Sequence, residues 1–217
     1  MRPAGLTITA LISLLATVVL ALLVAHGHSP YRFEDDALDW LGPPSAVSAW
    51  ADVVDLLGIP VLSAVVAVSV CIGLLRKAFS RVVVYAALAA AALLTSEHLV
   101  KPLVQRTYDA ELTFPSGSVT AVAATALAMW LALGPVLGTR ERRLGLLLGI
   151  SWTLLMSVAV VGALWHTPLD CLGSVLLSIG IVTAGGALFE WATGRRPSVT
   201  AVRVGTRTGR RRSTGSA

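Results

Sequence analysis

Six long apolar stretches, separated by short polar segments, dominate the pattern of hydrophobic and polar positions along the 217 residues. Each is close to the roughly 20 apolar residues that a helix needs to cross a membrane. None alternates polar and apolar residues as a barrel strand would, and backbone groups in lipid must bond within their own segment. The pattern therefore predicts six membrane-spanning helices, over Leu6–Ala25, Ile59–Leu75, Val82–Val100, Val119–Leu137, Leu144–Leu164 and Leu169–Trp191.

Two of these stretches admit a second interpretation. The second stretch is the weakest, because Asp52, Asp55 and Pro60 crowd its start. The first resembles a secretory signal peptide, since Arg2 precedes it and small residues lie near Ala25. It is longer than the ~7–15 apolar residues of a typical signal peptide. We therefore expect an uncleaved first helix.

Basic residues are distributed unevenly between the polar segments. Six crossings put 14 of the 17 Lys and Arg residues on one side, whereas Arg32, Lys101 and Arg106 face the other. Segments rich in Lys and Arg stay in the cytoplasm. We therefore expect a multi-pass protein of the cell membrane with both termini inside and the Lys101 side facing outward.

The composition agrees with a membrane protein, since 55% of the residues are hydrophobic and only 13% are charged. Soluble domains carry about 25% charged residues. We divide the chain into a transmembrane domain over residues 1–192 and a disordered basic tail over residues 193–217. The tail is either a solvated flank or a contact for anionic lipid headgroups. Nucleic-acid binding is not indicated, because the basic residues do not lie on a folded soluble module.

The segment from His26 to Asp52 combines an acidic run after Arg32 with apolar residues at helical spacing. It predicts a short amphipathic helix at the membrane interface, with Trp40 and Trp50 as anchors. The acidic residues either shape the approach of an anionic substrate or form the solvated face of that helix, and the solvated face is the simpler interpretation.

Two cations lie just beyond the third stretch, on the side expected to face outward. Lys101 and Arg106 run against the inward bias of basic residues, although a snorkelling side chain at a helix end explains either one alone. Glu97 and His98 precede Lys101 by about one helical turn. Both could approach the site, and packing inside the helix is the simpler interpretation for both.

The residues Pro115, Ser116, Gly117 and Ser118 precede the fourth stretch. Ser116 is a candidate N-cap, and Gly117 permits a close approach to the backbone. The free N–H groups and the positive dipole end of such a helix bind anions. The segment is therefore a candidate phosphate site, with simple helix capping as the alternative.

His166 and Asp170 stand at the start of the last stretch. Thr167 can cap this helix with Pro168 in its first turn, and Asp170 then resembles the acidic end of a capping box. Capping does not account for His166. A His beside a buried carboxylate has a fixed tautomer and a nucleophilic ring, so its attack on phosphorus gives a phosphohistidine that water hydrolyses. One His and one Asp are too few ligands for a metal, and we expect no cofactor.

The order Lys…Arg, Pro-Ser-Gly and His-x3-Asp on six helices resembles the type 2 phosphatidic acid phosphatase (PAP2) superfamily. Its members are membrane lipid phosphatases that share their site with some vanadium haloperoxidases. The resemblance implies an all-α integral membrane bundle and hydrolysis of a lipid phosphate or polyprenyl pyrophosphate. It makes His166 the nucleophile and Asp170 the group that orients it. The residues that it implies for phosphate binding are Lys101, Arg106, Ser116, Gly117 and Ser118.

The match to the family motifs, which read K-x6-R-P, P-S-G-H and S-R-x5-H-x3-D, is partial. Tyr108 and Asp109 stand where the first motif has Arg-Pro, and Ala159 and Val160 where the third has Ser-Arg. Ser118 replaces the His that protonates the leaving group. Each lost Arg removes a bidentate phosphate contact, and losing a general acid costs about 10²–10⁴-fold in rate. A pyrophosphate suffers least, because its leaving group is weakly basic.

Three classes of function follow from this pattern. The first is a phosphatase that acts on membrane lipid phosphates. The second is a catalytically degenerate relative that binds phospholipid headgroups without turnover, which the missing motif residues favour. The third is a small transporter or a structural membrane protein. Transport is disfavoured, because the ionisable groups cluster at helix ends rather than at mid-membrane depth.

Overall fold

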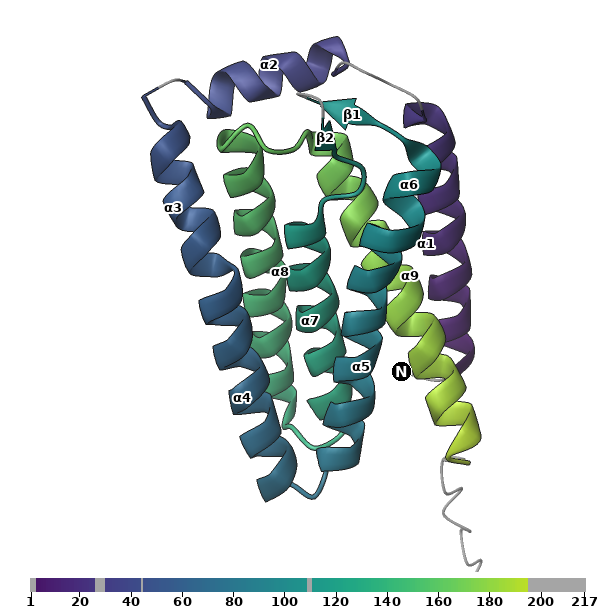
Figure 1. The fold of residues 1–217 in the computed structure, drawn as a ribbon. Coiled ribbons are helices and arrows are strands. Elements are labelled where there is room, and N and C mark those ends of the chain that lie inside the picture. Colours follow the sequence, from purple (N-terminus) through teal and green to yellow (C-terminus); the bar gives the residue numbers. More distant parts are fainter. Residues whose placement is uncertain (1–2, 26–29, 44, 109–110, 195–217) are drawn as a thin grey trace, which may run out of the picture.

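The protein is a bundle of helices with a short two-stranded ribbon at one end (Figure 1). It is seen here in a computed structural model that describes residues 3–25, 30–43, 45–108 and 111–194. The helices of the first half are α1 (Pro3–Val24), α2 (Arg32–Leu41), α3 (Val47–Leu57), α4 (Ile59–Leu75) and α5 (Phe79–Thr95). A π-helical turn (Ser96–Val100) and α6 (Lys101–Val104) extend α5, and the ribbon pairs β1 (Thr107–Tyr108) with β2 (Glu111–Leu112). The helices of the second half are α7 (Gly117–Leu133), α8 (Thr139–Gly162) and α9 (Pro168–Ala192).

All six predicted apolar stretches are helical. Five helical runs are long and apolar enough to cross a membrane, and α7 is a shorter apolar helix of 17 residues. The number of crossings therefore depends on α7, and six crossings remain a prediction. The helix α9 ends at Ala192, and the division into a transmembrane domain over residues 1–192 and a tail remains a prediction. The predicted tail lies outside the described residues from position 195 onward.

The second span differs from its prediction, because the helical run begins at Val47 rather than at Ile59. Asp52 and Asp55 lie on the exposed face of α3, while Val54 between them is buried. The acidic residues are therefore compatible with a helix that packs on one side. The run is interrupted at Gly58, which is the N-cap of α4. Pro60 is the second residue of α4, where the lack of a backbone N–H costs no helical hydrogen bond.

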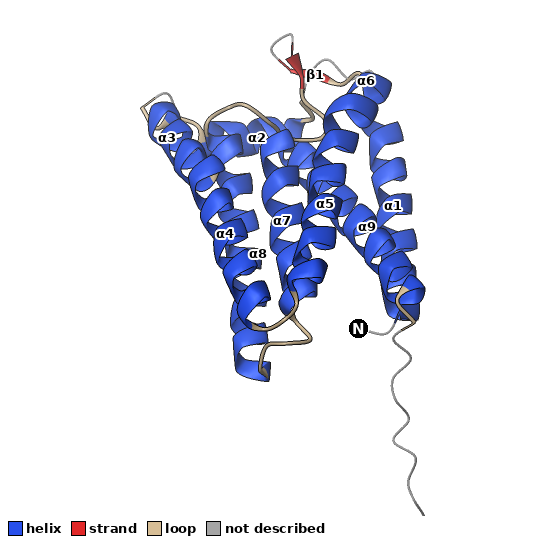
Figure 2. Ribbon diagram, turned by 60° about the horizontal axis from the view of Figure 1, so that its bottom comes forward, coloured by secondary structure: helices blue, strands red, loops and turns tan. Residues whose placement is uncertain are grey.

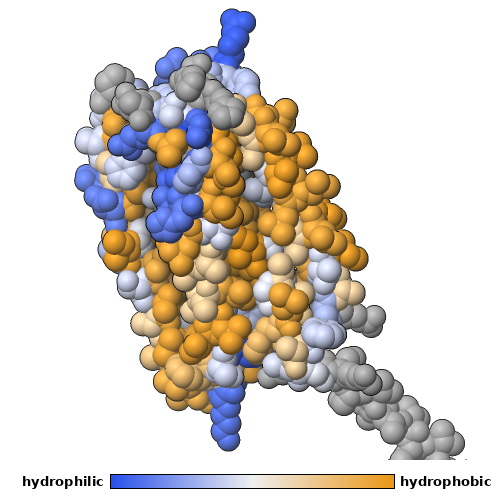
Figure 3. All heavy atoms as spheres, turned by 45° about the vertical axis from the view of Figure 1, so that its right-hand side comes forward, coloured by the Kyte–Doolittle hydropathy of each residue, from blue (hydrophilic) through white to orange (hydrophobic). Residues whose placement is uncertain are grey.

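The bundle packs around α7, which contacts α5, α8 and α9, while α1 lies along α9 (Figures 1 and 2). Ala124, Ala128 and Ala132 recur every fourth residue on α7 and are fully buried. Small residues let helix backbones approach closely, which is how helices associate in lipid. The outer faces are apolar, and hydrophobic residues cover much of the side of the bundle in Figure 3.

The two ends of the bundle differ in what they carry. The start of α1 and the end of α9 lie at the same end as the α4–α5 and α7–α8 connections (Figure 1). The other end carries α2, the ribbon and α6. Arg81 lies inside α5. It is only 4% exposed, pairs with Glu190 and donates to the carbonyls of Leu131 and Ala132 at the end of α7.

The amphipathic helix expected before Asp52 is present as α2, which lies across one end of the bundle (Figure 1). Asp35, Asp36 and Asp39 are exposed, as the solvated-face interpretation predicts. Glu34 departs from it, because its side chain is fully buried. The contacts of Glu34 explain this difference and belong to the candidate site.

Candidate active site

The connection between α8 and α9 places His166 beside Asp170. Thr167 is the N-cap of α9 and Pro168 its first residue, and the Asp170 carboxylate accepts the Thr167 N–H at 2.9 Å. The same carboxylate oxygen, Oδ2, lies 3.8 Å from His166 Nδ1. Capping and the His–Asp pairing are therefore not alternatives, because one carboxylate serves both.

The His166 ring is placed for reaction at its other nitrogen. Nδ1 faces the carboxylate, is buried and has no hydrogen-bond partner among the described residues. The distance of 3.8 Å exceeds a normal hydrogen bond, and such contacts often tighten only when substrate binds. Because Nδ1 is directed at Asp170, Nε2 is the nitrogen available to a substrate.

Arg106 lies between two buried carboxylates. Its guanidinium donates to Asp170 Oδ1 at 3.0 Å and to Glu34 Oε2 at 2.6 Å. Arg106 is 2% exposed, and Glu34 and Asp170 are fully buried. We call these three residues the buried carboxylate–arginine cluster. Arg106 therefore supports the His–Asp pair from behind, which differs from the phosphate contact that the sequence suggested.

Glu34 also connects α2 to the start of α9. Its Oε1 accepts the Leu169 N–H at 3.2 Å, and its Oε2 accepts the Tyr31 N–H at 2.9 Å. A carboxylate at a helix N-terminus satisfies free N–H groups and interacts favourably with the dipole. This role of Glu34 was not predicted from the sequence. The signal was the spacing of Glu34 with Leu38 and Leu41, which puts the acidic residue on the buried face of its helix.

Lys101 and Glu97 face each other on the π-helical turn and α6. Lys101 Nζ lies 2.9 Å from Glu97 Oε2. The turn precedes Pro102, which cannot donate a backbone hydrogen bond inside a helix, and such π-turns occur often at functional sites. Glu97 is thus directed toward the site, whereas His98 is exposed. The expectation that both are packed inside the helix is wrong.

The start of α7 supplies backbone groups to the site. Ser116 is the N-cap, fully buried, and its own N–H already donates to the Asp170 carbonyl at 3.3 Å. Ser174 Oγ donates to the Ser116 carbonyl at 2.9 Å, so Ser116 ties α7 to α9. Gly117 and Ser118, the first two residues of the helix, line the adjacent cavity.

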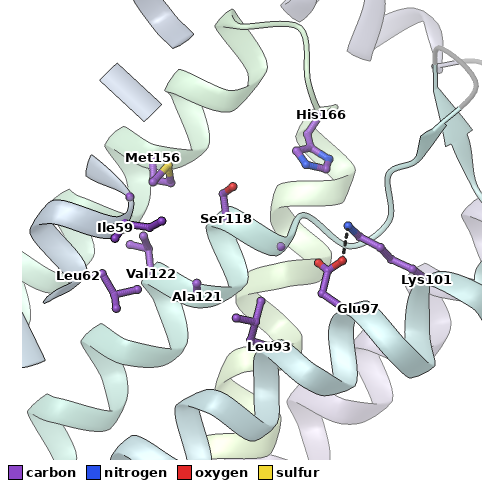
Figure 4. Close-up of a pocket in the computed structure, with 12 residues that line it drawn as sticks. Ile59, Leu62, Leu93, Glu97, Lys101, Ser118, Ala121, Val122, Met156 and His166 are labelled. Carbon is purple, nitrogen blue, oxygen red and sulfur yellow. Dashed lines mark hydrogen bonds and ion pairs between the residues drawn. The ribbon is translucent and has the colours of Figure 1, made fainter. Parts of the chain in front are cut away.

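This cavity, the site cavity, has a volume of about 400 Å³ and joins a polar end to an apolar wall (Figure 4). Its polar end combines side chains from α6 and its π-turn, from α7 and from the α8–α9 connection. Its wall comes from α4, α5, α7 and α8. The polar lining residues are Glu97, Lys101, Ser118 and His166, and the apolar ones include Ile59, Leu62, Leu93, Val122 and Met156.

Positions 108 and 160, where the family motifs carry Arg, are occupied in this protein by residues that pack in or against its interior. Val160 and its neighbour Ala159 are fully buried in an apolar cluster that includes Met156, and Tyr108 packs against the same cluster. An arginine at position 160 would enter this cluster. Among the described residues that line the site cavity, Lys101 is the only Lys or Arg.

Comparisons with known proteins identify the family and the fold. The family model of the PAP2 superfamily matches residues 97–194. The fold is similar to the crystal structure of a transmembrane PAP2 type phosphatidylglycerolphosphate phosphatase from Bacillus subtilis. The TM-score is 0.70 at 14% sequence identity, over 87% of this chain and 99% of that one. This segment, residues 97–194 of the chain, belongs to the PAP2 superfamily.

As a PAP2 protein it is a multi-pass, mostly helical membrane protein of phosphatase type. The segment that matches the family contains every predicted site residue, from Lys101 to Asp170. Glu34 lies outside it. A search of the curated proteins found no match. Within the described residues, no group of three or more His, Cys, Asp or Glu side chains is placed to hold a metal ion.

Proposed function

We propose that this PAP2 protein hydrolyses a membrane lipid phosphate or polyprenyl pyrophosphate through a phosphohistidine at His166. The observation that carries the proposal is the site cavity, in which one end is cationic and nucleophilic and the wall is apolar. A lipid phosphate has the same division, with a charged headgroup and an apolar chain. Ligand cavities generally match their ligands in this way.

The chemistry follows from the placement of each group. Lys101 and the N–H groups of Gly117 and Ser118 hold the phosphate. Nε2 of His166 attacks phosphorus, the bond to the leaving oxygen breaks, and a phosphohistidine forms. Asp170 fixes the ring and stabilises the positive charge that the ring acquires. Water then attacks phosphorus, breaks the N–P bond and releases inorganic phosphate.

We further propose that the site faces outward. It lies at the end of the bundle opposite to the termini and the basic α4–α5 connection (Figure 1). Because basic loops remain in the cytoplasm, the opposite end faces the outside. Substrate would then enter from the outer leaflet.

A second candidate is a protein that binds phospholipid headgroups without turnover. The observation that favours it is Ser118, which cannot protonate a leaving group near neutral pH. The packing of Val160 in an apolar cluster also favours it, because it leaves the site with fewer cations.

The test is phosphate release by the purified full-length protein in detergent from a panel of lipid monophosphates and pyrophosphates. We expect turnover that His166→Ala abolishes, together with an acid-labile phosphoenzyme in the wild type. The matched control is His98→Ala, an exposed residue of the π-turn, which should retain turnover. Headgroup binding with no phosphate release from any lipid would favour the binding protein. Turnover that survives His166→Ala would contradict the assigned nucleophile.

A further inference from the structure

Glu97 occupies a part of the site cavity that attracts anions (Figure 4). Its Oε2 lies 2.9 Å from Lys101 Nζ. Its Oε1 lies so close to Gly117 that a Cβ added there would overlap it. The carboxylate therefore sits between a cation and the N-terminus of α7, the two features that favour a bound phosphate.

A contribution to the stability of the fold does not explain why the Glu97 carboxylate lies in the site cavity. The Glu97 side chain is 35% exposed and its partner is one helical turn away on the same helical run. Helix pairs of this kind contribute only about 0.3–0.5 kcal/mol. Phosphate binding does not account for it either, because a carboxylate repels a neighbouring phosphate unless one of them takes up a proton.

A role in proton transfer during hydrolysis does explain why Glu97 lies in the site cavity. Ser118 stands where the family has its proton donor, and a serine hydroxyl does not supply that proton near neutral pH. The ionisable side chains that line the site cavity are Glu97, Lys101 and His166. His166 is the nucleophile in the proposed function, and Lys101 holds the phosphate as a cation. Glu97 is the group that remains.

We propose that Glu97 is the general acid and base of this site and supplies the proton transfers that Ser118 does not; the proposal rests on the proposed phosphatase function. In the first step His166 Nε2 forms a bond to phosphorus and the bond to the leaving oxygen breaks. The protonated Glu97 carboxyl gives its proton to that oxygen, so that an alcohol departs. In the second step the Glu97 carboxylate takes a proton from the water that attacks the phosphohistidine.

A bound phosphate would change the surroundings of Glu97. A phosphate that binds Lys101 takes over the Nζ contact and comes to lie beside the carboxylate. Two adjacent anions favour the uptake of a proton by one of them. The charged or titratable groups that face Glu97 in the site cavity are Lys101 from its own helical run and His166 from the α8–α9 connection. On the other sides α7 contributes its N-terminus, and α4 and α5 contribute apolar residues.

The experiment compares two substrates that share one alkyl chain, an alkyl monophosphate and the matching alkyl pyrophosphate. The measured quantity is the rate of leaving-group release in a single turnover of the full-length protein in detergent, with phosphoenzyme trapped in parallel. The variant is Glu97→Gln, which keeps the shape of the side chain and removes the proton. The matched control is Glu111→Gln, an exposed residue of β2.

Glu97→Gln should slow release from the monophosphate by about 10²–10⁴-fold, the usual cost of losing a general acid. Release from the pyrophosphate should slow by less than about tenfold, because its leaving group needs little protonation. With the pyrophosphate, whose first step is little affected, phosphohistidine should accumulate in the variant, because the attacking water has lost its base. Adding Ser118→His to the variant should restore release from the monophosphate. Glu111→Gln should behave as the wild type.

Equal slowing with both substrates, or none, would overturn the assignment of Glu97. A wild type that is active and requires His166, together with a fully active Glu97→Gln, would leave the phosphatase intact and remove only this assignment. A wild type that releases neither leaving group would overturn the phosphatase function, and the role of Glu97 with it.

Discussion

At the scale of single residues, Asp170 carries most of the organisation of the site. It caps α9 through Thr167, holds Arg106 and lies 3.8 Å from His166. The buried carboxylate–arginine cluster contains two carboxylates and one guanidinium, so it has an excess of one negative charge. An imidazole that attacks phosphorus becomes positive, and a fixed negative charge beside it stabilises that change without reorganisation.

Glu34 is the second carboxylate of this cluster, and the variant Glu34→Gln tests what its hydrogen bonds contribute to the stability of the fold. The amide cannot form charge-assisted hydrogen bonds to Arg106, Leu169 and Tyr31 together, because one of its two groups is a donor. We expect the free energy of unfolding to fall by about 1–3 kcal/mol, the usual cost of an unsatisfied buried partner. Thermal unfolding in detergent measures it. Asp36→Asn, an exposed change on the same helix, is the control, and equal melting temperatures for both variants would contradict this role.

Residue patterns predicted only part of this site. Lys101, His166 and the α7 start were recognisable, because motifs within a few residues place them at helix ends. Arg106 was also recognisable as a candidate site residue. The sequence predicted that it binds phosphate, whereas in the structure it is buried between two carboxylates. The pair Arg106–Glu34 spans 72 residues of sequence. No local pattern specifies such a contact, since it depends on how α2 lies across the bundle.

At the scale of elements, helix starts build the site. The N-terminal ends of α7 and α9 meet through Ser116, Ser174 and Asp170. Hydrophobicity alone located these helices to within a few residues. It missed the first part of the α3–α4 run, because Asp52 and Asp55 lower the mean hydropathy while occupying only the exposed face.

Gly173 on α9 tests the coupling between these elements. A Cβ at this position would overlap the ring of Phe114, which is fully buried and precedes the α7 cap by two residues. Gly173→Ala should therefore displace Phe114 and the start of α7. We expect a loss of about 1–3 kcal/mol, typical of overpacking, and a lower rate of phosphate release.

The control for this change is Gly145→Ala on α8. A Cβ at Gly145 meets only Trp130, at 3.9 Å, which is an ordinary contact. This variant should keep both the melting temperature and the phosphate release of the wild type. If Gly173→Ala behaves in the same way, the close packing of Phe114 on α9 does not position the α7 start.

At the scale of the whole molecule, the fold separates cations by role. Arg76 and Lys77 lie in and beside the α4–α5 connection, at the end that carries the termini, and Arg140 follows the α7–α8 connection at the same end. Arg81 lies near this end too, but it is buried with Glu190 and contributes to packing. Lys101 lies at the other end, in the site cavity. The basic residues of the α4–α5 and α7–α8 connections, without the buried Arg81, are therefore the ones that bear on the orientation of the protein in the membrane.

This asymmetry predicts the topology, which reporter fusions measure. Reporters placed after Arg81 and after Arg143 follow the two basic connections and should report the cytoplasm, because such connections resist translocation. A reporter placed after Arg106 follows the end of α6 and should report the outside. The α7 helix decides the outcome, since its 17 residues must cross for both basic connections to share a side. An outside signal after Arg143 combined with a cytoplasmic signal after Arg81 would mean that α7 does not cross. An outside signal after Arg81 would reverse the orientation and place the site cavity in the cytoplasm.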